Sequence, residues 1–261
     1  PDDVIVYPGH GAGSACGKNM MKETVDTLGH QKEMNYALNQ PNKEAFVAAV
    51  TDGLLPPPAY FPMNVAMNKK GYTSIDKVME AGARAIDAKE FEKLADATGA
   101  VILDVRNASD FAKASIPQSI NIGLDGQFAP WVGAIIADVK QPLLLVTEEG
   151  REEETAMRLA RVGFDNIIGY LNGGMAAWTA AGFVTDKVNR ITAAEFAAAF
   201  KPTESLVIDV RKESEYRAEH VEEAYNKPLD FINEWTGAID PHQHFFLHCA
   251  GGYRSMMAAS I

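Results

Sequence analysis

The sequence predicts an α/β protein in which one α/β/α unit with a central parallel sheet occurs twice in tandem. An internal repeat and a regular alternation of short apolar runs with helical patterns carry this prediction. The length of 261 residues exceeds one typical domain and suggests two. An apolar fraction of 47% with 23% charged residues is ordinary for a globular protein, so a packed core is feasible.

Three features return in the same order in the two copies. They are a helical pattern, a buried strand that ends in Asp-Val-Arg, and an acidic residue followed by an aromatic one. They lie at 86–91, 100–106 and 110–111 in the first copy and at 191–196, 205–211 and 215–216 in the second. We therefore place the first copy at residues 83–186 and the second at 187–261.

The remainder of the first copy keeps alternating strands and helices. A strand is expected at 142–146, a helix at 152–162, a turn and strand at 163–168, and a turn and helix at 173–178. This order is typical of a parallel sheet covered on both faces. The second copy stops inside a helix, so by comparison with the first we expect it to be truncated by roughly two dozen residues.

Residues 1–82 have a different pattern and form a separate segment. A short strand leads into a Gly-rich loop that contains His10. Helical patterns follow at 22–40 and 43–52, the prolines of 56–62 are expected to interrupt regular structure, and 74–81 reads as a short capped helix.

Cys249 is the most informative residue. It ends an apolar strand, a glycine-containing loop follows it, and the loop closes on Arg254, where a helical pattern begins. Loop N–H groups and the start of the helix are expected to face the sulfur, and Arg254 adds positive charge. These features favour a thiolate nucleophile over a merely buried cysteine.

The length of the Cys249 loop indicates sulfur transfer. Four residues separate Cys249 from Arg254, a spacing suited to a single sulfur or a small anion. The loop of cysteine phosphatases resembles it but has one more intervening residue and accommodates a phosphate. The predicted substrate-binding residues are Ala250, Gly251, Gly252, Tyr253 and Ser255.

Several other residues are candidates for supporting or binding roles. Asp209 and Arg211 are expected to form a charge-assisted pair that supports the loop. His242, His244 and His248 lack a compact metal-binding spacing, and His248 is expected to be a strand residue beside the thiolate. Cys16 is interpreted as loop packing, with a second redox thiol as the alternative.

Composition also excludes classes of partner. The net charge of -11 argues against a nucleic-acid partner, which requires a basic face. No apolar run approaches membrane-spanning length, so no membrane association is expected. The two cysteines lie far apart in different contexts, which fits a reducing, cytoplasmic location better than a disulfide framework.

Both copies resemble the rhodanese family of sulfurtransferases. In the second copy the resemblance rests on Asp-Val-Arg at 209–211 and on Cys249, Gly252 and Arg254; in the first it rests on Asp-Val-Arg at 104–106 and on the run 171–178. Thr147 stands where the second copy has Cys249, and Glu152 stands where it has Arg254. Because a threonine among acidic residues offers no thiolate, the first copy is expected to be inactive.

Residues 1–82 resemble the C-terminal piece of an αββα metallo-β-lactamase fold, most closely that of persulfide dioxygenases fused to rhodanese domains. The resemblance rests on 7–17 and on the proline run before Tyr60 and Phe61. It implies one non-haem iron, alternatively zinc, in the complete parent protein, with His10 as a metal-site or outer-shell residue. One histidine holds no catalytic metal alone, so no cofactor is expected in this chain.

Together these features predict a sulfurtransferase that moves sulfane sulfur through a persulfide on Cys249. The expected partners are a small-molecule persulfide, thiosulfate, sulfite or glutathione, with homo-oligomerisation left open. The resemblance leaves a second enzyme class open, a glyoxalase-II-like metallohydrolase. In that alternative the rhodanese copies are non-catalytic interaction modules.

Overall fold

The computed structural model describes residues 1–9, 22–52, 60–71, 74–201, 204–240 and 243–261. The chain divides into two compact units, Pro1–Pro57 and Pro58–Ile261. His10, Cys16, His242 and the prolines at 56–58 lie outside the described residues.

The first unit is small and contains one two-stranded antiparallel sheet among its described residues. β1 (Ile5–Val6) pairs with β2 (Asp26–Thr27), which leads into α1 (Leu28–Met34), and α2 (Lys43–Thr51) follows. A helix over 22–40 is wrong at both ends. The Thr27 side chain accepts a hydrogen bond from the main-chain N of His30 and caps α1, and Asn35 is extended, so the helix has only seven residues. The helix expected at 43–52 is confirmed.

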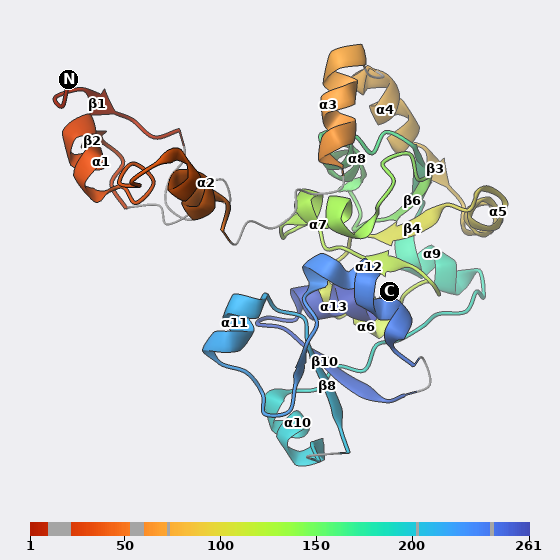
Figure 1. Cartoon of the computed structure of the whole chain (residues 1–261). Coiled ribbons are helices and arrows are strands. Elements are labelled where there is room, and N and C mark those ends of the chain that lie inside the picture. The colour runs from red at the N-terminus through yellow and green to blue at the C-terminus, as the bar shows by residue number, and fades with distance from the viewer. Residues whose placement is uncertain (10–21, 53–59, 72–73, 202–203, 241–242) are drawn as a thin grey trace. The chain divides into compact units, whose positions relative to one another are not determined.

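The second unit begins with a five-stranded parallel sheet in the order β3-β7-β6-β4-β5, covered by helices (Figure 1). Its strands are β3 (Ala85–Ile86), β4 (Val101–Asp104), β5 (Ile120–Asn121), β6 (Leu143–Val146) and β7 (Ile167–Leu171). Its helices are α3 (Phe61–Lys70), α4 (Ile75–Gly82), α5 (Ala88–Thr98), α6 (Ala108–Lys113), α7 (Phe128–Ile135), α8 (Glu152–Ala160) and α9 (Gly174–Ala180). All four residues of β6 are buried, as expected for a central strand with helices on both faces.

A second parallel sheet of the order β10-β8-β9 follows in the same unit. Its strands are β8 (Leu206–Asp209), β9 (Tyr225–Asn226) and β10 (Phe245–His248). The accompanying helices are α10 (Ala193–Ala199), α11 (Glu213–Ala218), α12 (Ile232–Trp235) and α13 (Tyr253–Ala259), with 3₁₀ turns at Leu229–Phe231 and Thr236–Ala238. β8, β9 and β10 repeat the neighbour relations of β4, β5 and β6, which confirms the repeat predicted from sequence.

The repeat extends to individual hydrogen bonds. In the first copy Asp104 accepts from the main-chain N and the guanidinium of Arg106, and in the second Asp209 accepts in the same way from Arg211. Each arginine also donates from Nη2 to a main-chain carbonyl eight residues further along. These pairs join the end of the central strand to the end of the next helix, which confirms the supporting pair expected at Asp209 and Arg211.

Helices α3 and α4 pack with the first copy, although the sequence boundary at residue 82 assigns them to the preceding segment. α4 contacts α8 and β7. Pro62 does not interrupt structure but lies in the first turn of α3, where the missing N–H of proline costs no helical hydrogen bond. Tyr60 packs so closely on Gly133 of α7 that the position has no room for a Cβ.

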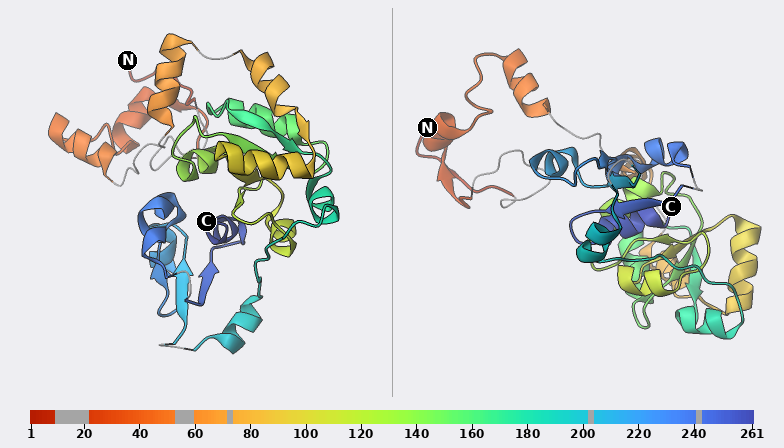
Figure 2. Two further views of the ribbon diagram at one scale, coloured as in Figure 1. Left: turned by 90° about the vertical axis from the view of Figure 1, so that its right-hand side faces the viewer. Right: turned by 90° about the horizontal axis from the view of Figure 1, so that it is seen from below.

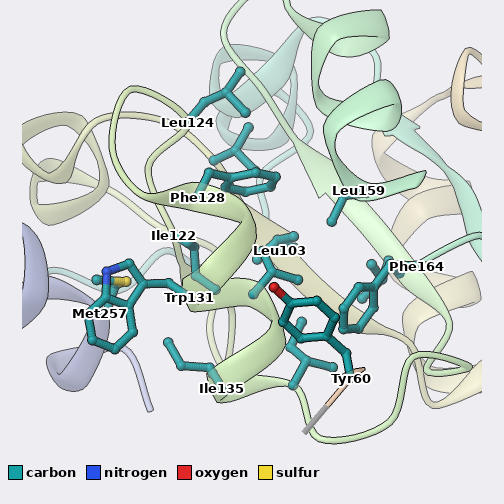
Figure 3. Packing of buried hydrophobic residues seen from close by; sticks show 14 of the residues in the cluster. Tyr60, Leu103, Ile122, Leu124, Phe128, Trp131, Ile135, Leu159, Phe164 and Met257 are labelled. Atoms are coloured by element: carbon teal, nitrogen blue, oxygen red, sulfur yellow. The ribbon is translucent and has the colours of Figure 1, made fainter. Parts of the chain in front are cut away.

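One hydrophobic cluster includes residues of both copies. Met257 from α13 is fully buried in the same cluster as Trp131, Ile122 and Leu103 of the first copy (Figure 3). α13 contacts α6 and β5 of the first copy as well as β10 of its own, so it lies between the two (Figure 2). The helix that follows the Cys249 loop is therefore anchored in a core that the first copy helps to build.

Candidate functional site

The end of β10 and the start of α13 position Cys249. β10 ends at His248, and the following loop reaches Gly252, whose φ of +88° is left-handed. Glycine adopts this conformation without the strain that a Cβ would bring, so it can turn the chain directly into α13. The Cys249 loop, residues 249–252, is thus a short connection that bends its main-chain N–H groups back toward the sulfur.

The sulfur of Cys249 has several hydrogen-bond donors around it. The main-chain N of Gly252 lies 3.1 Å from Sγ and that of Ser255 lies 3.4 Å from it. The Ser255 hydroxyl is 3.5 Å away, and the protonated thiol donates to it. Burial raises the pKa of the Cys249 thiol, but the hydroxyl and main-chain donors outweigh it, so the pKa is below its ordinary value. The loop therefore favours the thiolate, the nucleophilic form.

Arg254 does not donate to the sulfur. Its Nη1 donates to Glu215 Oε2 at 2.6 Å and its Nη2 to Oε1 at 2.8 Å, a two-point pair between α13 and α11. This pair lowers the pKa of Glu215 to about 2 and raises that of Arg254. The sequence predicts that Arg254 stabilises the thiolate; in the structure Arg254 is paired with Glu215, and its charge acts on Cys249 through space.

The other predicted binding residues take two different roles. Ala250 and Gly251 are exposed, and no atom lies within 4 Å of the position that a Cβ would take at Gly251. Tyr253 instead points to the first copy, where its hydroxyl donates to the carbonyl of Gly123 at 2.7 Å. Burial raises the pKa of Tyr253 to about 12, so it stays a neutral donor. The loop is therefore exposed to solvent at 250–251, and the residue that follows it, Tyr253, is held in place by its hydrogen bond to the first copy.

His248 precedes the nucleophile and is neutral. Its Nε2 is buried with no hydrogen-bond partner among the described residues, 3.7 Å from Asp209 Oδ2. Burial lowers the pKa of His248 more than the nearby Asp209 raises it. The prediction that His248 is a strand residue is confirmed, and burial disfavours a positive charge on its imidazole next to Cys249.

The corresponding loop of the first copy holds a carboxylate instead of a sulfur. Thr147 takes the position of Cys249, and Gly150, with φ of +83°, takes that of Gly252. Oε1 of Glu152 accepts from the main-chain N of Gly150 at 3.2 Å and lies 3.3 Å from the Thr147 hydroxyl. The first copy therefore directs the equivalent donor to its own side chain.

A metal centre finds no support in the part of the chain that is described. Outside the undescribed ranges, no group of three or more His, Cys, Asp or Glu side chains is arranged to hold a metal ion. The candidate His10 and the second cysteine, Cys16, are outside the described residues, so their roles stay predictions. No helix in the described ranges is both long and apolar enough to span a membrane.

Comparison with known families identifies the tandem copies. The model of the rhodanese-like domain family matches residues 87–181 and 192–261, which is more than half of the chain. The chain belongs to the rhodanese-like domain family. The first matched segment contains the Thr147 loop and the second contains Cys249, so the family resemblance inferred from the sequence motifs is confirmed for both copies.

Similar proteins extend this finding. The chain is 26% identical over 118 residues to an Arabidopsis thaliana protein named HIGH ARSENIC CONTENT 1, mitochondrial, covering 41% of this chain and 68% of that protein. A solved metallo-beta-lactamase from Staphylococcus aureus is 26% identical with a TM-score of 0.50, covering 65% of this chain and 45% of that one. A thiosulfate sulfurtransferase from Pseudomonas aeruginosa is 21% identical with a TM-score of 0.35, covering 71% of this chain and 43% of that one.

The family match and the S. aureus structure support the predicted fold class, tandem rhodanese-like α/β/α domains preceded by a piece of metallo-β-lactamase fold. The S. aureus match covers 65% of the chain, more than residues 1–82 can supply, so it includes part of the tandem region. This chain spans less than half of that solved protein.

Two features of the site are not predicted by the sequence motifs. Glu215 was noted only as part of the repeat, yet it holds Arg254. Its signal was an acidic residue six positions after Asp209, in the same place as Asp110 after Asp104. The support of Tyr253 by Gly123 had no sequence signal, because the two residues lie 130 positions apart.

Proposed function

We propose that the protein is a rhodanese-type sulfurtransferase that carries sulfane sulfur as a persulfide on Cys249. The observation that carries the proposal is the convergence of two main-chain N–H groups and the Ser255 hydroxyl on Sγ. The same donors that favour the thiolate would also stabilise the terminal sulfur of a persulfide, which is likewise an anion. Because Ala250 and Gly251 are exposed, a small sulfur-donating substrate can approach Cys249 from that side of the loop.

The transfer has two balanced steps. The Cys249 thiolate attacks the sulfane sulfur of thiosulfate or of a persulfide, a sulfur–sulfur bond forms, and the donor's own bond breaks with its electron pair leaving on sulfite or a thiolate. Sulfite, a thiol or cyanide then attacks the terminal sulfur of the persulfide and releases the Cys249 thiolate. Neither step changes the total number of electrons, so no external oxidant is needed.

Intact-protein mass spectrometry tests this proposal. Thiosulfate or glutathione persulfide is expected to add one sulfur atom to the protein, and cyanide or sulfite to remove it. Cys249→Ser should abolish both changes, because a hydroxyl without a base is a poor nucleophile at neutral pH. Cys16→Ser is the matched control and should retain both. Sulfur that persists in Cys249→Ser would move the chemistry to Cys16 and refute the proposal.

We further propose that the chain is part of a persulfide dioxygenase fused to rhodanese domains. The S. aureus match, which includes part of the tandem region, supports this assignment. The implied non-haem iron, or zinc, would require ligands outside the described residues, because none of the described clusters fits it; no step of the transfer involves it. The proposed setting is the cytoplasm, with small-molecule sulfur compounds as partners.

The first copy has a different proposed role, as a structural module. Its loop lacks the cysteine, and Glu152 takes the main-chain donor that faces the sulfur in the second copy. A glyoxalase-II-like hydrolase with two silent rhodanese copies is less well supported, because the donors around Cys249 would then have no chemical use.

A further inference from the structure

A cation from the first residues of the second copy, before α10, lies beside the Cys249 loop. Arg190 Nη2 is 3.6 Å from the position that a Cβ would occupy at Gly252, the residue whose main-chain N donates to Sγ. Covalent geometry then limits the distance between Nη2 and Sγ to about 9 Å. Nη1 of the same guanidinium donates to Ser109 Oγ at 2.5 Å, so α6 of the first copy holds the side chain in this position.

The charge of Arg190 is available to a ligand. Arg254 is paired with Glu215 and Arg211 with Asp209, so both nearby arginines already have carboxylate partners. Within the described ranges, no carboxylate lies at ion-pairing distance from Arg190, and the residue is exposed. A free cation at this place is notable in a chain whose net charge is -11.

We propose that Arg190 binds the anionic leaving group of the sulfur donor and thereby makes thiosulfate-type donors the preferred class. This inference rests on the proposed sulfurtransferase function. In thiosulfate the charged oxygens lie two bonds beyond the sulfur that Cys249 attacks, which places them within the reach of Arg190 when the sulfane sulfur meets Sγ. Arg190 then binds the sulfonate oxygens before transfer and the sulfite that departs with the electron pair of the broken bond.

Two donors that differ in charge test this assignment. Thiosulfate carries two negative charges, and methanethiosulfonate carries one and releases methanesulfinate after the same attack. For Arg190→Gln we expect KM for thiosulfate to rise about tenfold and KM for methanethiosulfonate about threefold, because the lost attraction scales with the charge of the donor. For both donors kcat should stay within about twofold, since Sγ and its donors are unchanged.

Three variants control the measurement. Arg190→Lys keeps the charge and should recover most of the affinity for thiosulfate. Ser109→Ala releases the guanidinium from α6 and should raise KM for thiosulfate by about threefold, less than the loss of the charge. Lys187→Gln removes the same charge from the same segment and should change KM by less than about twofold.

The outcomes separate this inference from the proposed function. If the unaltered protein takes sulfur from either donor but Arg190→Gln affects the two donors equally, or neither, the assignment of Arg190 is wrong and the function stands. An equal effect of Arg190→Gln and Lys187→Gln also overturns it, because the charge would then act through the general field of the protein. If Cys249 takes sulfur from neither donor, the function itself fails.

Discussion

The two copies build the same loop and put different anions in it. Gly252 and Gly150 both have a left-handed φ, and the main-chain N of each donates across a similar distance. In the second copy the acceptor is the sulfur of Cys249; in the first it is the carboxylate of Glu152, the first residue of the helix α8 that follows the loop. The first copy thus differs from the second in two ways: it has no thiol at position 147, and its own Glu152 carboxylate accepts from the main-chain donor.

The copies also converge on one segment of the first copy, residues 123–126 between β5 and α7. From the first loop, Arg151 pairs with Asp125 at 2.8 Å. From the second loop, the Tyr253 hydroxyl donates to Gly123. Arg151 and Tyr253 occupy the same position of the motif, directly after the left-handed glycine. The first copy therefore holds the start of the helix that follows the Cys249 loop.

The largest effect is expected from placing a thiol at position 147 of the first copy and then removing the Glu152 carboxylate beside it. In a Cys249→Ser background, Thr147→Cys alone should give a thiol of low reactivity, because the Glu152 carboxylate takes the Gly150 donor and repels a thiolate. Adding Glu152→Ala frees that donor and should raise the rate of alkylation at position 147 at pH 7 by about tenfold or more. Peptide mass spectrometry after iodoacetamide treatment distinguishes this thiol from Cys16.

A variant of the same size tests whether the charge of Glu152 is responsible. Glu152→Gln with Thr147→Cys keeps the size of the side chain and removes its charge, and we expect an intermediate rate. Equal rates for the single variant and for both double variants would show that the carboxylate does not silence the first copy.

The next effect should pass from the first copy to the Cys249 loop of the second. Gly126 faces the Tyr253 ring, and a Cβ there would meet its hydroxyl at 2.6 Å and Cε1 at 2.8 Å. Gly126→Ala therefore should displace Tyr253, lower the free energy of unfolding by about 1–3 kcal/mol, and slow sulfur uptake by Cys249. Urea unfolding and the rate of persulfide formation are the two measurements.

A second substitution tests whether Gly126→Ala acts through Tyr253 or through a general loss of stability. Tyr253→Ala removes the ring that the new methyl group meets, so Gly126→Ala should have little further effect in that background. Gly237→Ala serves as the control, because nothing lies within 4 Å of its Cβ position. Additive losses in the double variant would mean that the two copies are not coupled through Tyr253.

Local patterns predicted most of the fold but little of what joins the copies. Residues close in sequence form the buried strands, the Asp-Val-Arg pairs and the glycine loop. The repeat and the candidate nucleophile could therefore be predicted from the sequence. The contacts of Glu215 with Arg254 and of Tyr253 with Gly123 depend on the packing of distant elements. The motif therefore indicates Arg254 as a cation near the loop but not Glu215, the carboxylate that holds it.

The smallest effect concerns the pH at which the second loop becomes reactive. The hydroxyl and main-chain donors hold the pKa of Cys249 below its ordinary value despite burial, so the thiolate forms at lower pH than in a free cysteine. Ser255→Ala removes the hydroxyl and keeps the main-chain donors. Because the Ser255 hydroxyl lowers the pKa of Cys249, removing it should raise that pKa. The midpoint of the alkylation rate against pH should therefore move upward, while the plateau at high pH changes little.

Thr155→Ala, which alters a hydroxyl in the first copy, is the control and should leave the midpoint unchanged. A midpoint that stays the same in Ser255→Ala would show that the main-chain groups alone set the reactivity of Cys249, and the difference between the two loops would then lie in the backbone donors and the anion they meet.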